Sequence, residues 1–125
     1  MLQSSITLKI ALNSGLLLII LAFGRVLHTT GRPYLTGLFT AHQVATVALA
    51  GYLILILSSY MKNSGTTMIL TVWLITGTFF LLILLLTGLF LYRERHLILS
   101  LWLHRLATAG FIIALAGILW NISIA

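Results

Sequence analysis

Apolar residues fill most of this chain in four long blocks, and polar residues collect in the short segments between them. A helix needs about 20 apolar residues to cross the hydrocarbon core of a bilayer, and each block is close to that length. The pattern therefore predicts four transmembrane helices, which cover residues 10–27, 38–59, 67–91 and 98–120.

Three short connections separate the predicted helices, at residues 25–37, 60–66 and 92–97. Pro33 and the glycines of the first two connections are typical of turns. Because short connections make consecutive helices antiparallel, we expect an all-α, up-down-up-down four-helix transmembrane bundle. The whole chain, residues 1–125, is predicted to form this single transmembrane domain.

Composition agrees with a membrane location and narrows the chemistry. Of 125 residues, 61% are hydrophobic and 6% are charged, which leaves little sequence for a soluble domain. The absence of cysteine excludes disulfides, thiolate metal sites, iron–sulfur clusters and covalently attached haem. The net charge of +6, with Glu94 as the single acid, concerns topology and lipid headgroups in so apolar a chain, not nucleic acid.

The basic residues are distributed unevenly across the predicted membrane. Five arginines lie on the side of the first and third connections, at positions 25, 32, 93, 95 and 105, whereas the other side has only Lys9, Lys62 and the terminal amine. By the positive-inside rule, we expect the arginine side in the cytoplasm and both termini outside. The first block is also typical of a signal peptide, but cleavage there would break an internal repeat, so we interpret it as the first transmembrane helix.

One short phrase occurs twice in the chain, with an offset of 62 residues. Segment 42–46 reads HQVAT and segment 104–108 reads HRLAT, so histidine, alanine and threonine recur at equal positions. The offset is half the chain length, and we predict two repeated hairpins, residues 1–62 and 63–125, related by a pseudo-twofold axis along the membrane normal. Side chains at equivalent positions near that axis would meet.

His42 and His104 are the strongest candidates for a functional site. Each lies near the start of a predicted helix, where an ionisable side chain is costly unless it is paired or functional. Hydrogen bonding to a neighbouring helix would explain either histidine alone, but a repeated pair at similar depth favours a shared role. Because two facing imidazoles can serve as the axial ligands of a b-type haem iron, we predict that His42 and His104 hold a non-covalent haem b.

Residues near the two histidines fit a flat, anionic cofactor. Four small residues follow the histidines at i+3 and i+4, on the same helix face: Ala45, Thr46, Ala107 and Thr108. Their small side chains would let a macrocycle lie between the helices, although the threonine hydroxyls would otherwise bond their own helix. Arg105 and Arg32 are predicted to bind the haem propionates, since guanidinium pairs well with carboxylates, while topology alone explains Arg32 equally well. Thr40, Ser100 or a backbone carbonyl would accept the second ring N–H of each imidazole.

In these features the chain resembles small four-helix transmembrane b-type cytochromes, the membrane-anchor subunits that carry haem through histidines of the bundle. The resemblance is architectural, covers the whole chain and carries over only His42 and His104 as axial ligands. It implies an electron-transfer subunit that is not catalytic alone, working with other subunits of a membrane redox complex. Electrons would pass between a quinone in the bilayer and a partner protein on the arginine side.

The remaining titratable residues are weaker candidates for a functional site. Glu94, His28 and His96 are the available proton acceptors for a quinone, but an ion pair with a neighbouring arginine is the better interpretation of Glu94. All four histidines lie on one side of the membrane, which argues against a relay of haems across it. His28 with His96 would hold a second haem only near the surface.

Other functions compete with the haem prediction. A (bacterio)chlorophyll-binding subunit of a photosynthetic complex remains open, because magnesium takes a single imidazole and the two histidines would hold two pigments. A cofactor-free scaffold subunit also remains open, and its helix glycines would serve packing alone. These glycines are Gly15, Gly51, Gly77, Gly88, Gly110 and Gly117. A small multidrug-type transporter is rejected, since such carriers depend on a carboxylate within the membrane and the four predicted helices contain none.

Overall fold

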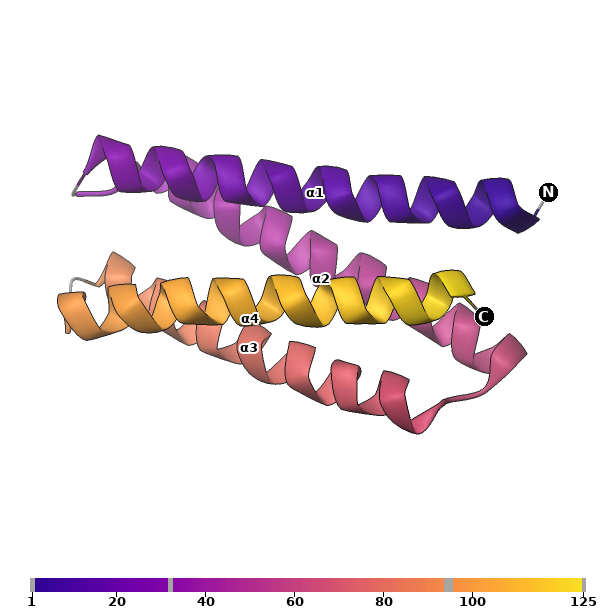
Figure 1. The fold of residues 1–125 in the computed structure, drawn as a ribbon. Helices are drawn as coiled ribbons and strands as arrows, with labels where there is room; N and C mark the ends of the chain where they lie inside the picture. The colour runs from indigo at the N-terminus through magenta and orange to yellow at the C-terminus, as the bar shows by residue number, and fades with distance from the viewer. Residues whose placement is uncertain (1, 32, 94–95, 125) are drawn as a thin grey trace. The chain divides into compact units, whose positions relative to one another are not determined.

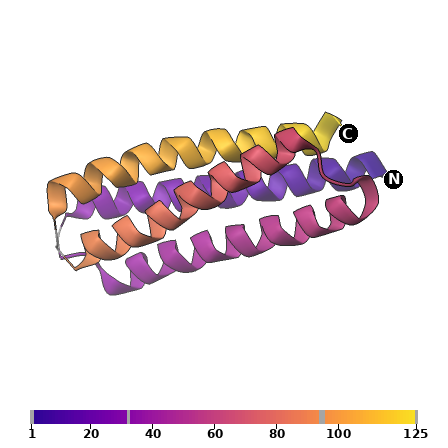
Figure 2. The ribbon, with the colours of Figure 1, turned by 90° about the horizontal axis from the view of Figure 1, so that it is seen from below.

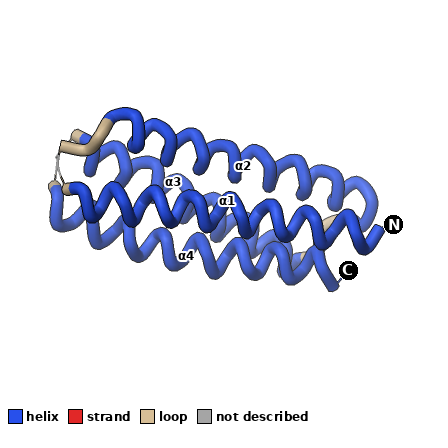
Figure 3. Tube along the Cα trace, turned by 90° about the horizontal axis from the view of Figure 1, so that it is seen from above, coloured by secondary structure: helices blue, strands red, loops and turns tan. Residues whose placement is uncertain are grey.

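The computed structural model of the chain describes residues 2–31, 33–93 and 96–124. Four α-helices account for nearly all of this part (Figure 1). They are α1 (Leu2–Thr30), α2 (Thr36–Ser64), α3 (Met68–Tyr92) and α4 (Leu97–Ile124). The described residues contain no strand, as Figure 3 shows. The prediction of an all-α chain with four long apolar helices is confirmed.

Each helix is long and apolar enough to cross a membrane. The spans that meet both criteria are Thr7–Thr30, Thr36–Ser64, Met68–Tyr92 and Leu97–Ser123. Large apolar side chains are exposed along all four helices, among them Leu18, Ile54, Ile75 and Ile113. Lipid accommodates such side chains, and the chain is a multi-pass integral membrane protein.

The helices extend beyond the apolar blocks, so the connections are shorter than predicted. Gly31 and Gly65 follow the last residues of α1 and α2 with φ of 73° and 74°, the left-handed conformation that glycine adopts without steric cost when it ends a helix. Pro33 cannot extend the helix further. The predicted first connection, residues 25–37, therefore begins too early: Arg25 and His28 belong to the last turns of α1.

Local hydrogen bonds define the starts of α3 and α4. The hydroxyl of Thr67, an extended residue before α3, accepts the Leu70 N–H at 3.2 Å and caps the helix. His96 precedes α4 with φ of 49°, and its carbonyl accepts the Ser100 N–H at 2.9 Å. A histidine is less favourable than glycine in the left-handed region, so the backbone conformation of His96 costs some free energy in the turn into α4.

The chain divides into two compact units, Met1–Asn63 and Ser64–Ala125. In each unit two helices joined by a short connection form an antiparallel hairpin, α1 with α2 and α3 with α4 (Figures 1 and 2). The division falls one residue from the boundary of the predicted repeat. The pseudo-twofold relation between the halves stays a prediction.

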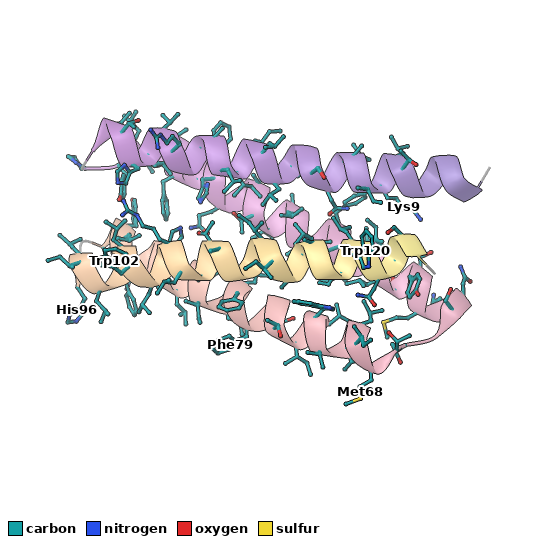
Figure 4. All side chains as sticks on the ribbon, viewed as in Figure 1. Lys9, Met68, Phe79, His96, Trp102 and Trp120 are labelled. Atoms are coloured by element: carbon teal, nitrogen blue, oxygen red, sulfur yellow. The ribbon has the colours of Figure 1, made fainter. Side chains whose placement is uncertain are left out.

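Aromatic rings of α3 pack on glycines of α4 in the second hairpin. A Cβ atom on Gly110 would lie 2.4–2.6 Å from three ring atoms of Phe80, and one on Gly117 would lie 2.5–2.9 Å from ring atoms of Trp73. Both rings thus occupy the space where a larger residue would place its side chain. By contrast, Phe79 is 59% exposed and projects from the side of α3 turned away from α4 (Figure 4).

Candidate cofactor-binding histidines

His104 lies on α4 and is hydrogen-bonded to α3 within the second hairpin. Its Nδ1 atom lies 2.9 Å from the hydroxyl oxygen of Thr87. The same hydroxyl donates its hydrogen to the backbone carbonyl of Ile83 at 2.7 Å, with a longer approach of 3.3 Å to the carbonyl of Leu84. His104 is half-buried and Thr87 is buried.

These contacts favour one tautomer of His104. A threonine hydroxyl has one hydrogen, and that of Thr87 is directed at the helix backbone. The Thr87 oxygen therefore accepts a hydrogen bond from His104 Nδ1–H, and in the neutral ring the lone pair then lies on Nε2.

His42 is held differently, by the backbone of α1 within the first hairpin. Its ring lies against the backbone of Ile20, and its Nδ1 atom is buried with no hydrogen-bond partner among residues 2–31, 33–93 and 96–124. A Cβ atom built on Gly24 would lie 3.4 Å from Cε1 and 4.0 Å from Nδ1 of His42.

The repeated phrase around the two histidines forms the same local hydrogen bond in both helices. The Thr46 hydroxyl donates to the His42 carbonyl at 2.9 Å, and the Thr108 hydroxyl donates to the His104 carbonyl at 2.8 Å. Bonding to the same helix is what an isolated threonine does, and both threonines do it. The repeated phrase thus has a repeated local structure, whereas the partners of the two imidazole rings differ.

The other predicted contact residues are placed as follows. Ala45 and Thr108 are half-buried, Ala107 and Thr46 are buried, and Arg105 is exposed. Arg32 lies outside the described residues, so its predicted role stays a prediction.

The residues considered for a second site lie at helix ends. His28 is exposed in the last turn of α1 and His96 is exposed at the start of α4, beside the connection from α3 (Figure 4). Glu94 lies outside the described part of the chain. Within that part no three His, Cys, Asp or Glu side chains are grouped as metal ligands, and the predicted haem needs only two imidazoles.

Thr87, Ile20 and Gly24 are contacts of the two histidines that the sequence pattern does not predict. A backbone carbonyl was among the expected acceptors, but its position on α1 depends on the register of the hairpin. Thr87 did have a sequence signal, because it is the one polar side chain in the apolar run 79–91. No protein-family model, curated protein or solved structure matches the chain.

Proposed function

We propose that this chain is a haem-holding electron-transfer subunit of a membrane complex, with His104 and His42 as the axial ligands of one haem b. The observation that carries the proposal is the hydrogen bond of 2.9 Å between His104 Nδ1 and Thr87. Metal-ligating histidines usually donate their second ring N–H to a neighbouring acceptor, which fixes the tautomer and the ring orientation. His104 already has this arrangement inside a membrane helix.

His42 supports the proposal through its buried Nδ1 atom, which has no partner among the described residues. Buried polar atoms normally have a partner, and a metal bound at this ring nitrogen would supply one. The ring of His104 is oriented by a hydrogen bond to a side chain, and we propose that His104 is the stronger ligand of the two.

The proposed architecture is an up-down-up-down bundle of two hairpins about a pseudo-twofold axis. It would bring the two repeated histidines to one site, lined by the small residues that follow them. Four antiparallel spans would put the α1–α2 and α3–α4 connections on one side, and the arginines there favour a cytoplasmic location by the positive-inside rule. Arg105 is exposed and is proposed, with Arg32, to bind propionates.

A bound haem b would supply a carrier for one electron at a time. The protein's own contribution would be to orient two imidazoles, to exclude water with apolar helices and to neutralise the propionates with guanidinium groups. Without a soluble domain, electrons would pass to a partner subunit on the arginine side and from or to a quinone in the bilayer.

A pigment-binding subunit is the second candidate, and the difference between the rings favours it. The Nδ1 atom of His104 is hydrogen-bonded to Thr87, whereas the Nδ1 atom of His42 is buried beside Gly24 with no partner among the described residues. Two unlike imidazoles can each bind one chlorin magnesium, which takes a single imidazole. They do not need to face each other.

The deciding experiment is an absorption spectrum of the purified protein, oxidised and then reduced with dithionite. The proposal predicts a sharp b-type band on reduction, which is lost in His104→Ala and in His42→Ala. Thr76→Val is the matched control, because the Thr76 hydroxyl is bonded only to the carbonyl of Val72 on its own helix.

Other spectra would contradict the proposal in distinct ways. A chlorin spectrum that loses part of its intensity in each histidine variant would support the pigment candidate. A preparation that is colourless and stays colourless with added haemin would exclude both and leave a scaffold subunit.

A further inference from the structure

We propose that Thr87 is a positioning residue that holds His104 in the Nδ1-protonated tautomer, and so makes Nε2 the ligand atom for a metal-bearing cofactor. The part that concerns a cofactor rests on the proposed function. The part that concerns the tautomer does not, because every contact behind it lies within the second hairpin.

The geometry forms a chain of two hydrogen bonds that ends on the helix backbone. His104 Nδ1–H donates to the Thr87 oxygen at 2.9 Å, and the Thr87 O–H donates to the Ile83 carbonyl at 2.7 Å. The second bond orients the hydroxyl, so its lone pair faces the imidazole. Bonds in such a chain polarise and strengthen one another in a medium of low dielectric constant.

The first hairpin has no equivalent of Thr87. The position 62 residues earlier is Arg25, an exposed side chain, and the ring of His42 lies against the backbone of Ile20 instead. A backbone carbonyl is present whatever residue stands at that position. Side-chain substitution can therefore change the tautomer of His104 alone, and Thr87 is the residue that makes the two histidines unequal.

A direct hydrogen bond to the second ring nitrogen makes an imidazole a stronger donor to a metal. Removing it lowers the affinity for a metal-bearing group by about 10–100-fold in known sites. A weaker donor also stabilises oxidised iron less, so the reduction potential of a haem at His104 would rise. Affinity and potential should thus change together in a Thr87 variant.

The first test reads the tautomer directly, with no cofactor present. The full chain is labelled with 15N-histidine, and the ring nitrogen signals of His104 are identified by their loss in His104→Ala. The proposal predicts protonated Nδ1 and unprotonated Nε2 in the native protein and in Thr87→Ser. In Thr87→Val and Thr87→Ala the Nδ1-protonated fraction should fall at least two-fold.

Thr108→Val is the matched control for this test. It removes a hydroxyl close to His104 that donates to the His104 carbonyl at 2.8 Å and not to the ring. Its ring signals should be those of the native protein. Unchanged signals in both Thr87→Val and Thr87→Ala, with native helix content by circular dichroism, would overturn the proposal, and so would an equal change in Thr108→Val.

The second test adds haemin to the same variants and measures its affinity and reduction potential. Thr87→Val should bind haemin about 10–100-fold more weakly and at a higher potential, whereas Thr87→Ser and Thr108→Val stay near native. If the tautomer changes but no variant, native included, binds haemin, the proposed function fails and the tautomer proposal stands. Native affinity and potential in Thr87→Val would overturn the cofactor part.

Discussion

At the scale of single residues, the local bonds of the two histidines are alike along the helix and unlike at the ring. Thr46 and Thr108 hydrogen-bond the carbonyls of His42 and His104 in the same way. These bonds join residues four positions apart, so the repeated phrase was enough to predict where they occur. The ring of His104 meets Thr87 through the pairing of two helices, which no local pattern specifies.

Gly24 provides a residue-scale prediction for His42. A Cβ on Gly24 would make ordinary van der Waals contact with the ring, at 3.4 and 4.0 Å, so Gly24→Ala should leave the histidine in place. Gly24→Leu should displace the ring and weaken haemin binding at least ten-fold. Absorption titration with haemin measures the affinity, and circular dichroism checks the helices. Equal affinities of native protein and Gly24→Leu would remove Gly24 from the site.

At the scale of elements, the second hairpin is held by three contacts at heptad spacing on α3. The residues involved are Trp73 on Gly117, Phe80 on Gly110 and Thr87 with His104. Positions seven apart lie on nearly the same helix face, so one register sets all three contacts. Small residues at helix contacts allow close approach in membranes. The packing that holds Phe80 and Trp73 therefore also brings Thr87 to the imidazole.

Gly110→Ala should destabilise this hairpin by about 1–3 kcal/mol, the usual cost of overpacking a filled site. The added carbon would meet the ring of Phe80 at 2.4–2.6 Å. Gly51→Ala is the control, since no atom of the described residues lies within 4 Å of its Cβ position, and it should change stability by less than about 0.5 kcal/mol. Reversible denaturant unfolding in detergent measures both free energies.

The clash also predicts a compensating change. Phe80→Leu combined with Gly110→Ala should recover at least half of the lost stability, because the shorter side chain vacates the occupied space. An additive double-mutant cycle would show that Gly110→Ala destabilises the hairpin through a contact other than Phe80.

The helix glycines differ in what lies beside them. Gly77, Gly110 and Gly117 pack against side chains of the opposite helix, whereas no described residue lies within 4 Å of the Cβ positions of Gly15 and Gly51.

At the scale of the whole molecule, the prediction of four spans assigns each connection to one side of the membrane. Thr29 lies in the last turn of α1, on the predicted arginine side, and Asn63 lies in the last turn of α2, on the predicted opposite side. Because the chain has no cysteine, a single introduced cysteine reports its own side without background. This property makes the predicted orientation directly measurable.

A membrane-impermeant maleimide should label Asn63→Cys in intact cells and Thr29→Cys only after permeabilisation. This is the result of the positive-inside rule with five arginines near the Thr29 side. The opposite labelling would put the arginine side outside. Labelling of both positions in intact cells would contradict the four-span arrangement itself.

Much of the fold followed from the sequence alone, because membrane helices are specified by local properties. About 20 apolar residues suffice for one span, and backbone hydrogen bonds inside the bilayer must then be satisfied within the helix. Gly31, Gly65 and Pro33 marked the turns. The precise helix ends were missed since a helix continues into polar sequence until a residue such as Gly31, with φ of 73°, ends it.

The sequence by itself determined that this chain is helical, crosses the membrane and carries two histidines in repeated local contexts, because spacing along one helix decides each of these. Only the tertiary structure decided which atoms those imidazoles meet. Thr87 faces His104, and Gly24 and Ile20 face His42, through the register of each antiparallel hairpin. That register depends on side chains such as Phe80 fitting against glycines of the opposite helix, and such a fit has no periodic signature in the chain.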